Sequence, residues 1–167
     1  LDAKIKESGG GVILAVLIRR VHRSRPITSY PGLLWMETRL IKTYRVLEAL
    51  NDWEKTDFHY GRSDCCQFAG FITERLTGKN YLSQFSYEGK AEADALIEKH
   101  NGLGNLIDSL LGESVSIEDL SDGNPVLMKL PIVGELLGIW LGNVGVGVTE
   151  KGLVRVLPAY CVRGWVT

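Results

Sequence analysis

The chain has 167 residues, of which 45% are hydrophobic and 23% charged, and its formal net charge is -1. This length predicts one domain with its own core, and the small net charge excludes a general attraction to nucleic acid or to an anionic membrane. Three cysteines cannot all pair internally, and no CxxC or repeated Cys/His spacing occurs. We therefore expect reduced thiols, no structural zinc site or other metal, and no cofactor.

Residues 1–36 differ in pattern from the rest and are expected to form an N-terminal arm or extension. The apolar run Val12–Ile18 follows three glycines and precedes a basic cluster between Arg19 and Arg25. Seven residues are too few for a membrane span, which needs about 20. Pro31 and Gly32 are expected to interrupt any regular structure. Two interpretations remain: an arm that docks on a neighbouring subunit, or a poorly structured extension before a domain that starts near Met36.

Residues 37–167 are expected to form one α+β domain whose first part is helical. Apolar residues at positions 40, 41, 44, 47 and 50 recur with the period of a helix. A second helix is expected to begin at Ser63 or Asp64 and to end at Gly78, a residue type favoured just after a helix C-terminus. Two more helices are expected over residues 88–100 and 103–111.

After Ser114 the pattern changes to short β-branched and aromatic runs bounded by Gly, Pro or Asn. We expect an antiparallel sheet of about four to six strands, with the cysteine-bearing helix packed on it. Asn143, Gly145 and Gly147 are interpreted as tight turns or bulges. The expected strands lie at residues 126–128, 136–141, 144–148, 153–157 and 160–166.

The stretch Phe58–Phe68 reads FHYGRSDCCQF and joins an aromatic loop to the second helix. Cys65 would lie in the first turn of that helix, where the helix dipole favours a thiolate. A cysteine nucleophile is often presented in this way. The alternative is that Cys65 is only a small apolar core residue. Cys66 should point to a different face, and Cys161 should lie in the core of the last strand.

This stretch resembles the motif of the NlpC/P60-like (papain-like) cysteine peptidase superfamily, and in particular a phage tail-associated branch of unknown function. The resemblance covers roughly residues 43–166. It implies a cysteine-bearing helix on an antiparallel sheet, Cys65 as candidate nucleophile and Tyr60 as a candidate substrate-binding residue. The motif positions matched are Phe58, Tyr60, Gly61, Asp64, Cys65 and Phe68.

The resemblance also implies a catalytic histidine, at the start of a strand that matches residues 137–142. Leu136 occupies that place, and no histidine follows His100. A peptidase needs a base to take the thiol proton and an acid to protonate the leaving amine. His59, six residues before Cys65, is the remaining candidate base. Asn124 stands where the superfamily often has Asp, and an Asn serves a turn there equally well.

The expected function is a bacteriophage tail or tail-tip structural or assembly protein with a degenerate NlpC/P60-like active site. Its expected partners are other tail proteins of the tip, hub or tube, bound through the N-terminal arm. The alternative is an active peptidase or amidase that cuts peptidoglycan stem peptides during phage genome entry. A third interpretation is a host-derived enzyme outside phage biology. The expected location is the virion tail, or the host cytoplasm during assembly.

Overall fold

The computed structural model describes residues 31–167, so the predictions for Val12–Ile18 and the basic cluster lie outside the described residues. The chain divides into two units, residues 1–38 and 39–167, and the domain below is the second of them. A single helix, α2 (Pro31–Trp53), runs through the predicted boundary at residue 36. Pro31 begins this helix rather than interrupting it, because the first turn of a helix needs no N–H from that residue.

The four predicted helices of the domain are confirmed. Gly78 ends α3 with a positive φ of 75°, as expected for a residue after a helix C-terminus. In the part of the chain that the structure describes, three short 3₁₀ helices lie in the connections. In chain order, these helices are α2 (Pro31–Trp53), α3 (Cys65–Thr77), η2 (Tyr81–Gln84), α4 (Gly89–Lys99), α5 (Leu103–Leu111), η3 (Ile117–Asp119) and η4 (Pro158–Tyr160).

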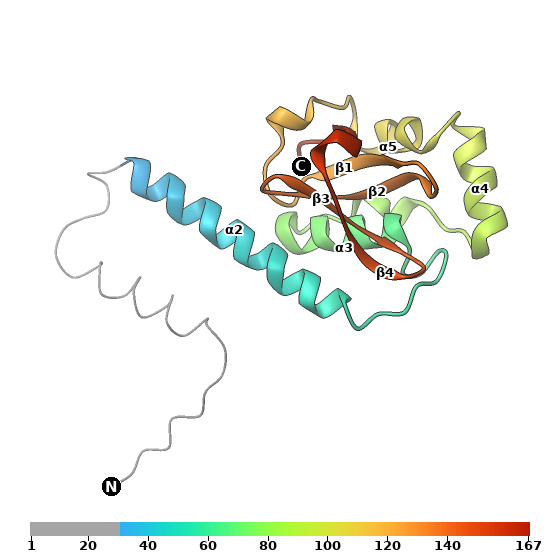
Figure 1. The fold of residues 1–167 in the computed structure, drawn as a ribbon, viewed down its shortest axis with the longest axis horizontal. Coiled ribbons are helices and arrows are strands. Elements are labelled where there is room, and N and C mark those ends of the chain that lie inside the picture. The colour runs from blue at the N-terminus through green and yellow to red at the C-terminus, as the bar shows by residue number, and fades with distance from the viewer. Residues whose placement is uncertain (1–30) are drawn as a thin grey trace, which may run out of the picture. The chain divides into compact units, whose positions relative to one another are not determined.

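The five predicted strands form one antiparallel sheet in the order β4-β3-β2-β1-β5, so the α+β prediction is confirmed. Figure 1 shows the helices first in the chain and the sheet after them, with α3 packed against the sheet. The strands are β1 (Pro125–Leu130), β2 (Gly134–Leu141), β3 (Val144–Thr149), β4 (Gly152–Val156) and β5 (Cys161–Gly164).

The two faces of β2 contribute to different parts of the core. Ile139 packs with Phe68 and Ile72 of α3, in a cluster that the C-terminal part of α2 also joins. Leu136, on the other face, packs in a cluster that includes the buried Cys161 of β5. The prediction that Cys161 is a core residue is therefore confirmed.

The helical period of α2 was predicted correctly, but most of its apolar stripe does not face the core. Val46, Ala49 and Trp53 are the α2 residues buried in the core, and of the five periodic positions only Leu50 packs against them. Periodicity identifies a helix, but it does not identify which of two apolar stripes is buried in the core. The four other periodic residues, Leu40, Ile41, Tyr44 and Leu47, are between 44% and 55% exposed.

The interpretation of Gly145 and Gly147 as turns or bulges is wrong, because both lie in the regular ladder of β3. A Cβ at Gly145 would lie 2.5 Å from the sulfur of Met128, and one at Gly147 would lie 2.8 Å from its terminal methyl group. These glycines therefore make room for a side chain from β1. The turn itself is formed by Gly142 and Asn143, where Gly142 has a φ of 67°.

Asn124 is buried in the turn that precedes β1. Its side-chain oxygen accepts hydrogen bonds from the backbone N–H of Ser121, at 2.8 Å, and from the Ser121 hydroxyl, at 2.9 Å. The prediction that an Asn serves this turn is confirmed.

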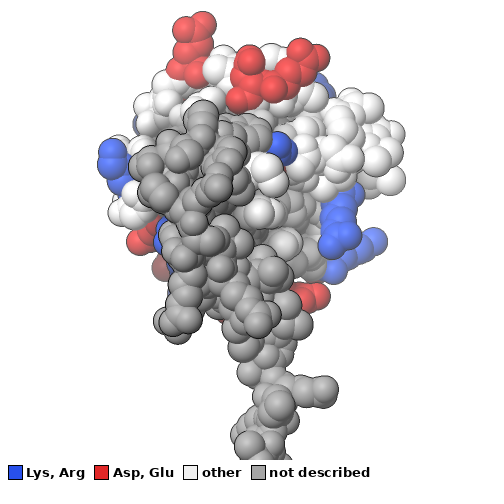
Figure 2. Space-filling view, turned by 90° about the vertical axis from the view of Figure 1, so that its left-hand side faces the viewer, with Lys and Arg blue, Asp and Glu red and all other residues white. Residues whose placement is uncertain are grey.

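The described surface carries charges of both signs. Figure 2 shows basic and acidic side chains separated by uncharged surface on the face that it presents. Among the described helices, none is long and apolar enough to cross a membrane.

Candidate functional site

The N-terminus of α3 is organised by Asp64, which is only 2% exposed. Its Oδ1 accepts hydrogen bonds from the backbone N–H groups of Cys66 and Gln67, both at 3.0 Å. Its Oδ2 accepts from the N–H of Gly61 at 2.6 Å and from the Tyr87 hydroxyl at 2.7 Å. Of the two predicted candidates, Ser63 and Asp64, Asp64 is thus the helix cap, and its carboxylate also anchors the loops on either side of α3.

Gly61 allows this arrangement to close. It has a φ of 82°, and a Cβ there would lie 1.9 Å from the backbone oxygen of Tyr87. Glycine is the residue that tolerates both the positive φ and the close approach. The Gly of the motif therefore brings the loop against Tyr87, whose hydroxyl in turn reaches Asp64.

Cys65 is the first residue of α3, and its half-buried side chain packs against the core clusters of both sheet faces. Hydrogen bonds from the Cys66 thiol and from the backbone of Leu137 lower the pKa of Cys65, whereas burial and the Asp64 charge raise it. The same contact with Cys65, together with burial, raises the pKa of Cys66 well above its ordinary value. Cys66, unlike Cys65, lines an apolar pocket with Leu82 and Phe85, although its thiol lies close enough to lower the pKa of Cys65.

The position at which a catalytic histidine was expected is occupied by a buried apolar residue, Leu136. Leu136 is 3% exposed and belongs to a cluster against which Cys65 packs. His59 is exposed on the loop before α3. His100 lies at the end of α4, where its Nδ1 is 2.9 Å from the backbone oxygen of Leu96. In the described part of the chain, no hydrogen bond joins an imidazole to Cys65.

The aromatic loop before α3 lines an open groove with a volume of about 670 Å³. Tyr60 packs edge-on against Phe58, with ring centroids 5.0 Å apart, and its hydroxyl lies 3.5 Å from Glu150. Burial and the nearby Glu150 charge raise the pKa of Tyr60. The predicted residues His59 and Tyr60 thus share this groove, and Cys65 is not part of its lining. The lining residues are Asp57, Phe58, His59, Tyr60, Arg62, Glu88, Gly89 and Glu150.

One group in the described chain has the spacing of metal ligands. A side-chain ligand atom from each of Asp64, Cys65 and Cys66 lies within 4.8 Å of the other two. Both Asp64 oxygens already accept two hydrogen bonds each, so only the two thiols remain as donors. Structural zinc almost always takes four ligands, so this set does not fit it.

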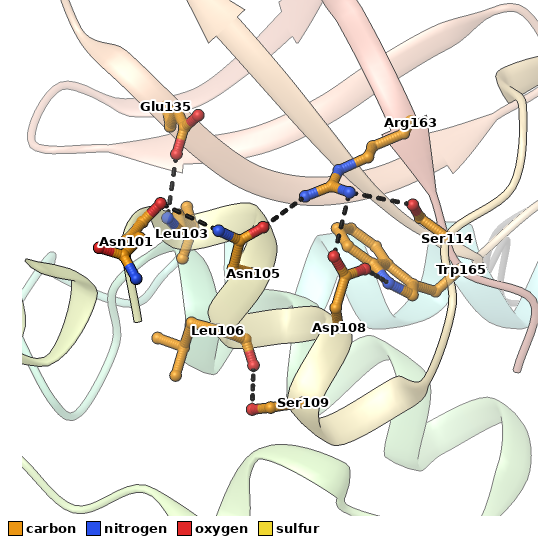
Figure 3. Close-up of polar contacts among 10 residues, drawn as sticks. All are labelled: Asn101, Leu103, Asn105, Leu106, Asp108, Ser109, Ser114, Glu135, Arg163 and Trp165. Atoms are coloured by element: carbon orange, nitrogen blue, oxygen red, sulfur yellow. Dashed lines mark hydrogen bonds and ion pairs between the residues drawn. The ribbon is translucent and has the colours of Figure 1, made fainter. Parts of the chain in front are cut away.

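A second polar cluster, which the sequence analysis did not find, ties β5 to α5 (Figure 3). Arg163 forms an ion pair with Asp108 at 3.0 Å and a hydrogen bond with Ser114 at 3.2 Å. The indole N–H of Trp165, which is fully buried, donates to Asp108 at 2.9 Å. These contacts link residues about 50 positions apart, so no local spacing could have indicated them. Their effect is to hold the C-terminal strand against α5.

Fold and site together define a class of protein, an α+β domain in which a cysteine-bearing helix packs on an antiparallel sheet. Within that class, the chain belongs to the DUF6950 family, a domain of unknown function, whose family model matches residues 38–167. A comparison with curated proteins finds no match. The matched range contains the capped helix, the groove and the whole sheet.

Proposed function

We propose that this protein is a bacteriophage tail or tail-tip assembly component, with an NlpC/P60-like fold whose cysteine site no longer catalyses hydrolysis. The phage assignment rests on the FHYGRSDCCQF motif and its resemblance to the tail-associated branch. In this role the domain is a docking module, and other tail proteins are its partners. The α+β architecture, with Cys65 at the start of a helix that lies on the sheet, is compatible with this proposal.

The single observation that carries the loss of activity is the packing of Cys65 against the cluster that contains Leu136. Leucine can neither accept the thiol proton nor donate a proton to a leaving amine. General acid–base assistance is worth about 10²–10⁴-fold in rate, and an amide nitrogen leaves poorly without it. The Asp64 carboxylate is committed to four hydrogen bonds and serves as a cap.

A second candidate function, a working peptidase or amidase on peptidoglycan stem peptides, has one observation in its favour. The Cys66 thiol and the Leu137 backbone act as hydrogen-bond donors that lower the pKa of Cys65, which favours the reactive thiolate. His59 and Tyr60 line an open groove on the loop that leads into α3. In this alternative, His59 acts as the base after the loop moves towards Cys65.

The test is complementation of a phage that carries a nonsense mutation in the gene for this protein. We expect the mutant to yield particles without functional tails, and the wild-type protein to be found in purified tails. Cys65→Ala should complement as well as the wild type, because the proposal assigns the thiol no chemical role. Normal tails without the protein would contradict the assembly role, and a Cys65→Ala phage that assembles but cannot deliver its genome would support the peptidase.

A further inference from the structure

Cys65 and Cys66 bring two thiols together at the start of α3. The Cys66 thiol donates a hydrogen bond to the Cys65 sulfur, so the two sulfurs approach each other and share a proton. Neighbouring residues of a helix ordinarily point to different sides, so this approach is a property of the folded site. Both side chains are half-buried, so a small ion can still reach them. The two sulfurs therefore form a chelating pair.

A disulfide between these two cysteines does not fit the start of the helix. Adjacent Cα atoms are about 3.8 Å apart, whereas the Cα atoms of disulfide-linked residues are usually about 4.4–6.8 Å apart. Closing the bond would distort the backbone whose N–H groups, at Cys66 and Gln67, donate to Asp64 at 3.0 Å. The capped helix therefore keeps the pair as two thiols that are available to a ligand.

The available donors select the kind of ion. A ligand atom of Asp64 lies within 4.8 Å of both sulfurs, but the carboxylate already accepts four hydrogen bonds. Two thiolates are too few for structural zinc or for an iron–sulfur cluster, which take four protein ligands. Thiolates favour soft cations, and Cu(I), a soft monovalent cation, is stable with two of them. The set therefore fits Cu(I).

The surroundings of the two sulfurs also favour this ion. The backbone of Leu137 provides a hydrogen bond that stabilises negative charge on the Cys65 sulfur. Cys66 lines an apolar pocket with Leu82 and Phe85, which limits the approach of water from that side. Cu(II), in contrast, prefers nitrogen and oxygen ligands in a tetragonal arrangement, and the two thiols do not supply them.

We propose that Cys65 and Cys66 form a Cu(I)-binding site in which the two thiolate sulfurs are the ligands. Binding releases both thiol protons to solvent and forms two Cu–S bonds, with no change in the oxidation state of copper or sulfur. The expectation of no metal rested on the absence of separated cysteine pairs such as CxxC. The assembly role requires no ion, so this proposal does not rest on the proposed function.

The test is competition for Cu(I) between the full reduced chain and bicinchoninate, a chelator that is coloured when it holds Cu(I), under nitrogen with ascorbate. We expect the wild type to remove one equivalent of Cu(I). Loss of an outer contact of a metal ligand already costs about 10–100-fold in affinity, so Cys65→Ala and Cys66→Ala should each weaken binding at least about 100-fold. The matched control is Cys161→Ala, which removes the buried third cysteine and should keep the wild-type affinity. Far-ultraviolet circular dichroism checks that each variant is folded.

X-ray absorption at the copper edge of the loaded protein identifies the ligands. We expect two sulfur neighbours and no oxygen or nitrogen neighbour. Excess Zn(II) should leave Cu(I) bound, because two ligands do not complete a zinc site. An oxygen neighbour, or more than two sulfurs, would contradict the two-thiolate site.

Three further results would overturn the proposal. The first is a wild type that removes no Cu(I) from bicinchoninate, and the second is wild-type affinity in both Cys65→Ala and Cys66→Ala. The third is equal affinity in the wild type unfolded in urea, because the folded start of α3 would then not be what forms the site.

Discussion

The two halves of the FHYGRSDCCQF motif lie in contrasting environments. The second half, around Asp64 and Cys65, is enclosed, and every described hydrogen bond of the Asp64 carboxylate is made to a structural donor. The first half, around His59 and Tyr60, lines an open groove. The enclosed half therefore serves the fold, because its carboxylate holds the start of α3 and the loop that contains Tyr87. The open half is the part that remains free to contact a larger ligand.

The largest expected effect comes from removing the acid of the enclosed half. Asp64→Ala deletes a helix cap and leaves four donors without their acceptor. Loss of a cap costs about 0.5–2 kcal/mol, and buried unsatisfied donors add about 1–3 kcal/mol, so we expect about 2–4 kcal/mol lower unfolding free energy. Urea denaturation measures it. The matched control is Glu150→Ala in the groove, which should change the unfolding free energy by no more than about 0.5 kcal/mol. Equal losses of unfolding free energy in the two variants would show that the two halves of the motif contribute equally to stability.

A smaller effect is expected from removing one hydroxyl in each half. Tyr87→Phe removes the 2.7 Å hydrogen bond to Asp64 and should cost about 1 kcal/mol. Tyr60→Phe removes only the 3.5 Å contact with the exposed Glu150 and should cost less than about 0.5 kcal/mol. Thermal and urea unfolding of the pair provide the comparison. A larger loss of unfolding free energy in Tyr60→Phe than in Tyr87→Phe would show that the open half, and not the enclosed half, stabilises the fold.

The enclosed half should also make stability depend on alkaline pH. Burial raises the pKa of Tyr87, so the unfolded chain releases this proton near pH 10 while the folded chain still holds it. The contribution of the protonated Tyr87 to the unfolding free energy is therefore fully present below about pH 10, and it falls as the pH rises above that value. Tyr87→Phe should show a shallower loss of unfolding free energy between about pH 9 and pH 11. Identical slopes in wild type and variant would contradict the raised pKa.

The smallest expected effect is on the reactivity of Cys65. The Cys66 thiol lowers the pKa of Cys65, so Cys66→Ala should shift the pH profile of iodoacetamide labelling at Cys65 to higher pH. His59→Ala should leave the profile unchanged, because His59 lies on the open groove. Mass spectrometry at each cysteine separates the sites. If the pH profile of Cys65 labelling shifts in His59→Ala and not in Cys66→Ala, His59 is the base that acts on Cys65.

Local patterns were sufficient to predict the helices, the five strands and a cap at Ser63 or Asp64, because period and capping depend on residues within one or two turns. The face of α2 that is buried depends on what α3 and the sheet offer, so periodicity could not decide it. The partnership of Tyr87 with Asp64 spans 23 residues and depends on the close approach at Gly61. The pairing of the Cys65 and Cys66 thiols depends on side-chain rotamers in a packed site.

We propose that the cysteine site of this fold does not catalyse hydrolysis. The most direct test is digestion of purified muropeptides with the wild type and with Cys65→Ala, followed by mass spectrometry of the products. We expect no cleavage above the buffer control in either sample. Turnover by the wild type that is lost in Cys65→Ala would contradict it.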